Sequence, residues 1–154
     1  MGEGPMPTEI KGSLGEEIAK KGGEVGATTG RPRRCGWFDA VSVKRIIQSN
    51  SVSALCLTKI DVLDGLENIK ICTSYDEDES KKAYAECMEL EDVNPSYIEI
   101  EGWPEPTAGI NNYDDFPQKA KNFVEKIAEV CGVPVDIVST GPDDASTILI
   151  NQEI

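Results

Sequence analysis

The sequence predicts an α/β protein in which a mixed sheet is flanked by helices. Short runs typical of strands alternate with segments of helical period, and clusters of Gly, Pro, Asp and Ser separate them. No internal repeat is present. The chain has 154 residues, of which 39% are hydrophobic, so it can bury a core as one domain or as part of a larger one.

The first helix is predicted close to the amino terminus. Ser13 and Glu16 form an S-x-x-E capping box, which indicates a helix over residues 14–21. Gly22 and Gly23 would stop it.

Two further helices are expected. Asp39 is suited to cap the second, which would end near Asn50 and carry Val43, Ile46 and Ile47 on one face. The clearest helix covers residues 117–130 and stops at Gly132. Its apolar positions recur at helical spacing and are Ala120, Phe123, Val124, Ile127 and Val130.

Five short strands complete the pattern. They are expected in SALCLT, ENIKICTSY, SYIEIEGW, VPVDIV and STILI. Asp64 and Gly65 mark a turn between the first two strands, and STGPDDA joins the last two. The polar run DEDESKK, residues 76–82, is interpreted as a solvated loop.

The charge of the chain is strongly acidic and uneven. The formal net charge is -13, with +1 over residues 1–70 and -14 over residues 71–154. This disfavours nucleic-acid binding, which needs a basic face to release counterions. A small anion held by local arginines remains compatible with it.

Cysteine usage and the amino terminus bear on the compartment. The five cysteines are odd in number and form no C-x-x-C pair, which favours a reducing cytoplasm. The first ten residues lack a basic segment followed by an apolar one, and no apolar run approaches the roughly 18 residues of a membrane span. Neither secretion nor membrane association is predicted.

Three loops concentrate groups suited to ligands, and the first is ATTGRPRR, residues 27–34. Gly30 permits close approach or unusual dihedral angles, and Pro32 restricts the chain before binding. Hydroxyl and guanidinium donors that match carboxylates and phosphates come from Thr28, Thr29, Arg31 and Arg33. A solvated surface patch is the alternative interpretation.

The second loop is TKID, which follows the apolar run LCL. Many GTP-binding proteins read guanine with a strand that ends in T-K-x-D. There the carboxylate, here Asp61, accepts from N1–H and the exocyclic amine, and the stem of the lysine, here Lys59, covers the ring. Adenine lacks both donors, and leaving the carboxylate unpaired costs about 1 to 3 kcal/mol. A strand end with two exposed charges is the alternative.

The third loop begins with Ser139, Thr140 and Gly141, directly after a strand. Their amides and hydroxyls could serve a base edge, although the same residues are typical of an ordinary turn.

Taken in order, these segments resemble one family. GEGPMPTE, GATTGRPRRCGWFDAV, LTKIDVLDG and GVPVDIVSTGPD resemble the carboxy-terminal part of adenylosuccinate synthetase, from residue 2 to about residue 150. The family uses GTP and magnesium to join inosine monophosphate (IMP) and L-aspartate through a phosphorylated intermediate. The resemblance implies a P-loop-NTPase-like fold, of which residues 1–154 would form the carboxy-terminal part.

The resemblance also implies roles for the three loops. The loop that closes over aspartate would consist of Ala27, Thr28, Thr29, Gly30, Arg31, Pro32 and Arg33. Within it, Arg31 would also reach IMP and Arg33 would reach GTP. The guanine base would be read by Lys59, Ile60, Asp61, Ser139, Thr140 and Gly141, with Pro142 beside it.

Other parts of the family pattern are missing from this chain. The family's phosphate loop, catalytic aspartate and catalytic histidine lie in an amino-terminal region, and this chain contains neither a G-x-x-x-x-G-K-[ST] motif nor any histidine. The expectation is therefore a fragment with no catalytic residue and no metal ligand, and Mg²⁺ would be bound by the missing region. The chain also departs from the family at Met1, where a valine is usual, and at Asp144, where arginine is common.

The expected partners follow from the same resemblance. They are GTP, IMP and L-aspartate, together with a second copy in a full-length homodimer. Two alternatives stay open: a viral-type relative that uses another purine monophosphate, and a non-catalytic nucleotide-binding or regulatory module.

Overall fold

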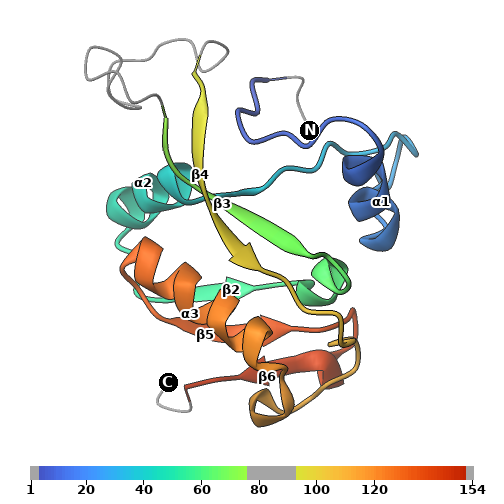
Figure 1. Ribbon diagram of the computed structural model, residues 1–154, viewed down its shortest axis with the longest axis vertical. Helices are drawn as coiled ribbons and strands as arrows, with labels where there is room; N and C mark the ends of the chain where they lie inside the picture. The colour runs from blue at the N-terminus through green and yellow to red at the C-terminus, as the bar shows by residue number, and fades with distance from the viewer. Residues whose placement is uncertain (1–3, 76–92, 152–154) are drawn as a thin grey trace. The chain divides into compact units, whose positions relative to one another are not determined.

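A computed structural model describes residues 4–75 and 93–151 of the chain (Figure 1). The chain forms two compact units, the first from residues 1–41 and 70–99 and the second from residues 42–69 and 100–154. Helices and strands alternate along the chain, which confirms the predicted α/β class. The run DEDESKK lies outside the described residues.

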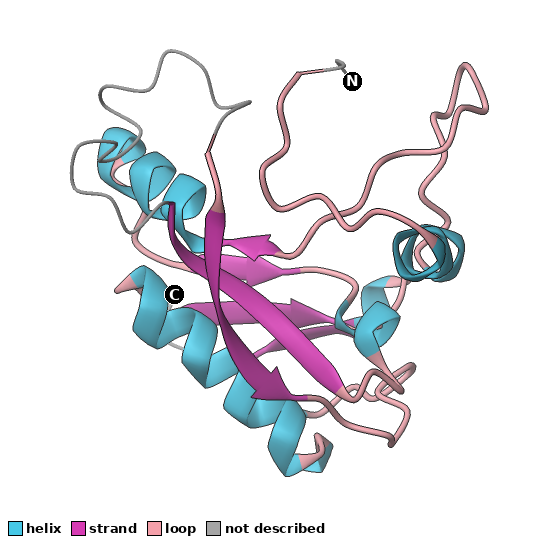
Figure 2. Ribbon diagram, turned by 45° about the horizontal axis from the view of Figure 1, so that its top comes forward, coloured by secondary structure: helices cyan, strands magenta, loops and turns pink. Residues whose placement is uncertain are grey.

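The first unit contains helix α1, Ser13–Lys21, which has coil before and after it (Figure 2). The predicted capping box is wrong, because Ser13 is the first helical residue and Gly12 is the N-cap, without a side-chain hydrogen bond. Gly12 has a φ of 84°, a conformation that strains any residue with a Cβ atom. The predicted stop is confirmed: Gly22 caps the helix, and Gly23 follows with a φ of 59°.

The sheet of the first unit has the strand order β1-β3-β4. These strands are Phe38–Asp39, Asn68–Tyr75 and Pro95–Glu101, so the two longer predicted strands are confirmed. Strand β1 runs parallel to β3 and places Asp39 opposite Cys72, which is fully buried. The Tyr75 hydroxyl donates a hydrogen bond to the Asp39 carboxylate. Burial, followed by the nearby Asp39 charge, raises the pKa of Cys72 to about 11, so this thiol remains protonated.

The sheet of the second unit has the order β2-β5-β6. Strand β2, Leu55–Leu57, runs parallel to β5, Val135–Ser139, and β5 runs antiparallel to β6, Thr147–Leu149. A 3₁₀ turn, η1, covers Ile60–Leu63 directly after β2. Two other 3₁₀ turns, η4 and η5, cover Tyr113–Asp115 and Asp144–Ser146.

Helix α3, Gln118–Cys131, packs against β5 and supplies much of the core of the second unit (Figure 1). Its buried residues include four of the five predicted apolar positions and are Ala120, Phe123, Val124, Ile127 and Cys131. The Phe123 ring lies 5.8 Å from the Trp103 ring, measured between centroids. Gly132 ends the helix with a φ of 76°, as predicted.

Helix α2, Ala40–Asn50, ends where predicted, and two residues of its predicted apolar face, Val43 and Ile47, are half-buried. Ile46 is 56% exposed.

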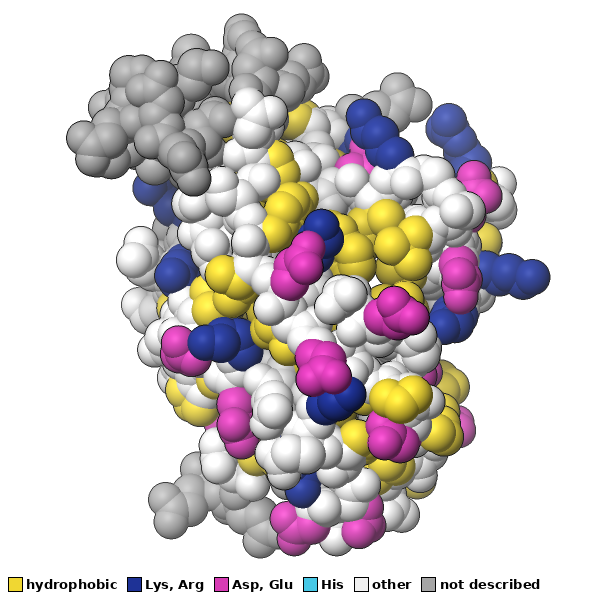
Figure 3. All heavy atoms as spheres, in the orientation of Figure 1, with side chains coloured by type: hydrophobic (Ala, Val, Ile, Leu, Met, Phe, Trp, Pro, Cys, Tyr) yellow, Lys and Arg dark blue, Asp and Glu magenta, His cyan; other side chains and the backbone are white. Residues whose placement is uncertain are grey.

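The surface charges are mixed on the face shown in Figure 3. Acidic and basic side chains are interspersed there, and Lys and Arg side chains project where Figure 1 places α1 and the loops beside it. In the part of the chain that the structure describes, no helix has the length and apolar character needed to cross a bilayer.

Candidate functional site

The arginine loop of the first unit is a small hairpin. Val25 and Pro32 form an antiparallel bridge, and the Gly26 amide donates to the Arg31 carbonyl at 2.9 Å. The Gly30 amide closes the turn by donating to the Gly26 carbonyl at 2.8 Å, with a φ of 63° at Gly30. The hairpin therefore presents the two threonines and Arg31 at its tip, where all three are exposed.

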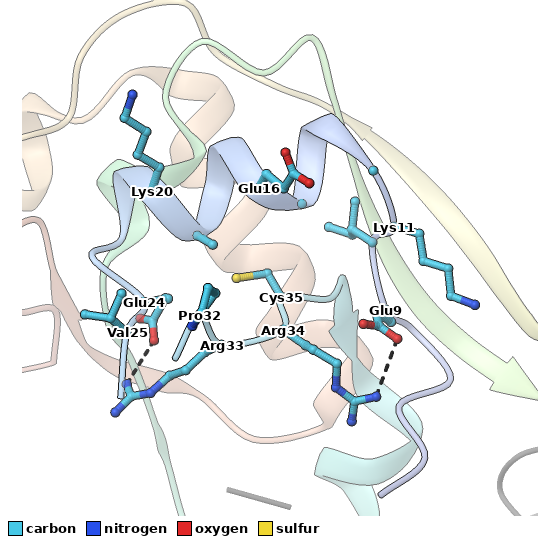
Figure 4. A pocket seen from close by; sticks show the side chains of 14 residues that line it. Glu9, Lys11, Glu16, Lys20, Glu24, Val25, Pro32, Arg33, Arg34 and Cys35 are labelled. Atoms are coloured by element: carbon cyan, nitrogen blue, oxygen red, sulfur yellow. Dashed lines mark hydrogen bonds and ion pairs between the residues drawn. The ribbon is translucent and has the colours of Figure 1, made fainter. Parts of the chain in front are cut away.

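Two arginines at the base of the hairpin are held by acidic residues. Arg33 Nη1 lies 3.0 Å from a Glu24 carboxylate oxygen, and Arg34 Nη1 lies 3.5 Å from a carboxylate oxygen of Glu9. Both pairs are drawn in Figure 4. Arg33 Nε is buried, and none of the described residues accepts a hydrogen bond from it. Glu24 and Glu9 had no role in the sequence-based prediction.

A cavity of about 560 Å³ adjoins these arginines in the first unit. Figure 4 shows α1, which carries Glu16 and Lys20, on one side and the segment from Pro32 to Cys35 on the other. Acidic and basic side chains both line the cavity, and the basic ones include Arg33 and Arg34. The sequence indicated the arginines but not the opposing helix, because their meeting depends on the packing of α1.

The TKID segment forms the bend that follows β2. Lys59 adopts a left-handed conformation, with φ 59° and ψ 42°, which is uncommon for a residue other than glycine. Ile60 is 3% exposed and anchors the turn, while Asp61 is half-buried.

The structure brings this segment together with the Ser139 segment. The Lys59 amide donates a hydrogen bond to Ser139 Oγ at 3.0 Å. The cause is sheet topology: β2 and β5 are parallel neighbours, so their carboxyl ends lie at the same edge, where ligands of α/β sheets commonly bind. The two segments that were predicted to read a base therefore lie side by side within the second unit.

Asp61 has an unusual environment in this site. Its Oδ1 atom is buried and lacks a hydrogen-bond partner among the described residues. Desolvation raises the pKa of the carboxyl above its ordinary value of 3.8, and the nearby Asp64 charge acts in the same direction. A buried acceptor without a donor is costly, and such groups are concentrated at functional sites.

The hydroxyl of Thr140 is buried and bonded within the fold, so it does not face a ligand. It is 1% exposed, and its Oγ1 donates to the Ile110 carbonyl at 2.8 Å. Its amide donates to the Ser146 carbonyl at 2.9 Å. Gly141 lies against Ser146, since an added Cβ atom would meet Ser146 Oγ at 2.9 Å. These contacts fix the shape of the loop around Ser139.

The carboxylate of Asp64 accepts several hydrogen bonds next to Asp61. From the sequence, Asp64 was predicted only to be a turn residue. One carboxylate oxygen accepts from Trp103 Nε1 at 2.6 Å and from Thr107 Oγ1 at 2.7 Å, and the other accepts from the Thr107 amide at 2.7 Å. Trp103 and Thr107 are fully buried. Nothing in the local pattern indicated these partners, because they are about forty residues away in the chain.

The described residues do not fit a metal site. Among them, no group of three or more His, Cys, Asp or Glu side chains is arranged to hold a metal ion.

Comparison with known proteins gives one consistent result. The sequence model of the adenylosuccinate synthetase family matches residues 1–148. The chain is 50% identical to the adenylosuccinate synthetase of Nitrosomonas eutropha and 48% identical to that of Nitrosomonas europaea, in each case over 98% of the chain and 36% of the relative. It is also similar to a fully ligated adenylosuccinate synthetase structure from Plasmodium falciparum, with a TM-score of 0.89, 32% identity and coverage of 97% of this chain and 37% of that one. The chain thus spans about a third of the length of these relatives.

Proposed function

The chain belongs to the adenylosuccinate synthetase family, and we propose that it supplies the aspartate loop and the guanine-reading site of such an enzyme. The reaction would join IMP to L-aspartate with GTP as co-substrate. Magnesium and the catalytic acid and base would come from outside residues 1–154, as would the phosphate loop. A homodimer is the proposed state of the complete enzyme.

The observation that carries this proposal is the unpartnered Oδ1 atom of Asp61. Guanine offers two adjacent donors, N1–H and the exocyclic amine, and a carboxylate can accept both. Adenine would turn its N1 acceptor toward the same charge, which leaves both groups unsatisfied. The Ser139 loop lies beside Lys59, so a base bound at Asp61 would also meet that loop.

The arginine loop fits the anionic partners of the same reaction. Arg31 at the hairpin tip is proposed to bind aspartate and IMP, together with the hydroxyls of Thr28 and Thr29. Arg33 is proposed to bind GTP, and its pairing with Glu24 would have to loosen or be shared when the nucleotide arrives. Loops of this kind commonly close on substrate and order their charged groups around it.

The proposal is tested in a carrier enzyme, defined as the Nitrosomonas eutropha synthetase whose matching portion is replaced by this chain. The measured quantity is the base preference, the kcat/KM for GTP divided by that for inosine triphosphate, which lacks the exocyclic amine. Asp61→Asn should weaken GTP binding by about 2 to 4 kcal/mol, or roughly 30- to 700-fold, and should lower the base preference.

Two variants serve as controls. Asp115→Asn makes the same change of charge at an exposed position of the second unit and should leave the base preference unchanged. Arg31→Ala should raise the KM for aspartate and leave the base preference intact, because its charge serves the anions. If Asp61→Asn retained the full base preference, Asp61 would not be the base reader.

A further inference from the structure

The two base-reading segments share one further neighbour, residues 103–110, here called the bridging segment. We propose that the bridging segment is a positioning device that sets the distance and orientation between Asp61 and the Ser139 loop. The inference rests on the proposed function, and it assigns roles to Thr107, Trp103 and Thr140 as positioning residues.

The first anchor of the bridging segment is Asp64. Its carboxylate accepts three hydrogen bonds of 2.6 to 2.7 Å from Trp103 and Thr107. The backbone is tied at the same place, because the Gly65 amide donates to the Trp103 carbonyl at 2.9 Å. Hydrogen bonds to an ionised carboxylate are stronger than neutral ones, so this anchor is stiff.

Asp64 is also hydrogen-bonded directly to Asp61, the proposed base reader. Its amide donates to the Asp61 carbonyl at 3.2 Å within the turn η1. The intervening residues form a single 3₁₀ turn, which leaves few ways for Asp61 to move independently of Asp64.

The second anchor is the Ile110 carbonyl, which accepts the Thr140 hydroxyl at 2.8 Å. The Ile110 amide donates to the Thr107 carbonyl at 3.1 Å, so the two anchors are linked by one turn of the bridging segment. Thr140 directly follows Ser139, whose Oγ accepts from the Lys59 amide. Hydrogen bonds and short stretches of chain therefore form a closed ring through both base-reading segments.

The ring predicts a specific kind of defect. A base bound at Asp61 and Ser139 needs donors and acceptors placed to within a fraction of an ångström, whereas the triphosphate and aspartate are bound by other residues. Loss of one bond in the ring should therefore impair discrimination between bases more than it impairs the use of aspartate.

The experiment uses the carrier enzyme with Thr107→Val and Thr140→Val, each of which removes one hydroxyl from the ring and keeps the side-chain shape. Each should lower the base preference about 2- to 10-fold, the effect of losing one hydrogen bond. Thr107→Ser and Thr140→Ser keep the hydroxyl and should keep the base preference within about twofold of the parent. The KM for aspartate should stay within the same range in all four variants.

Two further variants separate positioning from mere stability. Trp103→Phe removes a different donor to Asp64 and should lower the base preference even if a valine variant fails to fold. Thr8→Val makes the same substitution at a buried threonine of the first unit, so it should lower the melting temperature without changing the base preference.

The outcomes distinguish this inference from the proposed function. If Asp61→Asn lowers the base preference and the ring variants do not, the bridging segment has no positioning role and the base reader stands. If Asp61→Asn itself has no effect, the proposed function fails, and the inference fails with it.

Discussion

Two residues of the proposed base-reading site have an unfavourable conformation or environment in the folded chain. Lys59 has left-handed backbone angles, and Asp61 has a buried oxygen without a donor. Each is a local cost of a kind that is concentrated at functional sites. Neighbouring Asp64 has the same side chain but accepts three hydrogen bonds within the fold, which distinguishes its structural role from the ligand-binding role proposed for Asp61.

The raised pKa of Asp61 predicts how its substitution affects stability at different pH values. The folded chain binds the Asp61 proton more tightly than the unfolded chain, whose carboxyl has the ordinary pKa of 3.8. Its stabilising contribution is fully present below that pH and is lost as the pH rises through the folded pKa. Asp61→Asn, which cannot ionise, should therefore gain free energy of unfolding relative to the parent as the pH rises.

Urea unfolding of the 154-residue chain and of its Asp61→Asn variant at about pH 4 and about pH 7 tests this expectation. Asp115→Asn is the matched removal of an exposed charge. A stability difference for Asp61→Asn that did not change with pH would show that desolvation of this carboxyl is unimportant.

At the scale of elements, the sequence predicted the helices and strands whose apolar residues recur with a regular period. Helix α3 and strands β3 and β4 were predicted because their apolar residues recur at clear spacings over seven or more residues. The capping box at Ser13 was wrong because Gly12 is the N-cap and Ser13 already belongs to the helix, and Ile46 is exposed while its predicted neighbours on α2, Val43 and Ile47, are half-buried.

Long-range pairing set the limit of what could be predicted at the site. The loops at Asp61 and Ser139 were identified separately, but their meeting depends on the parallel pairing of β2 with β5, which are about eighty residues apart. The partners of Asp64 and the pairing of Arg33 with Glu24 likewise required the fold. Periodicity carries no information about which strands become neighbours.

The hairpin of the arginine loop leads to a prediction for one glycine. Gly30 has a φ of 63°, and an alanine in this conformation costs about 1 kcal/mol. Gly30→Ala in the carrier enzyme should therefore raise the KM for aspartate roughly fivefold, because the loop must be held in a less favourable shape. Steady-state kinetics with aspartate as the varied substrate measures this.

Gly23→Ala is the control for that substitution. Gly23 has a φ of 59° in the same unit but lies outside the aspartate loop, so its substitution should lower stability without changing the KM for aspartate. An equal effect of both substitutions on the KM would mean that general destabilisation, and not the loop, is responsible.

At the scale of the whole molecule, the proposed ligand groups are divided between two units. The aspartate loop belongs to the first unit and the base-reading segments belong to the second. The uneven charge follows the sequence and not the units: residues 1–70, which include the arginine loop and the TKID segment, have a net charge of +1, whereas residues 71–154 have a net charge of -14. A chain with a net charge of -13 repels phosphates, so the arginine loop and residues outside residues 1–154 would have to neutralise the triphosphate.

The acidic net charge and the share of the relatives' length that the chain spans lead to the last prediction. The chain spans 36% of the Nitrosomonas eutropha relative, and residues 1–154 contain no histidine and no phosphate-loop motif. Phosphoryl transfer depends on positioned cations around the phosphates, and the ligation also needs a proton donor and acceptor. We therefore expect the purified 154-residue chain to form no adenylosuccinate from IMP, aspartate and GTP with magnesium. Co-expression with the remaining portion of that relative should restore product, detected by chromatography, and Arg31→Ala in this chain should abolish most of the restored activity at low aspartate. Product formation by the purified chain above a protein-free blank would contradict the expectation.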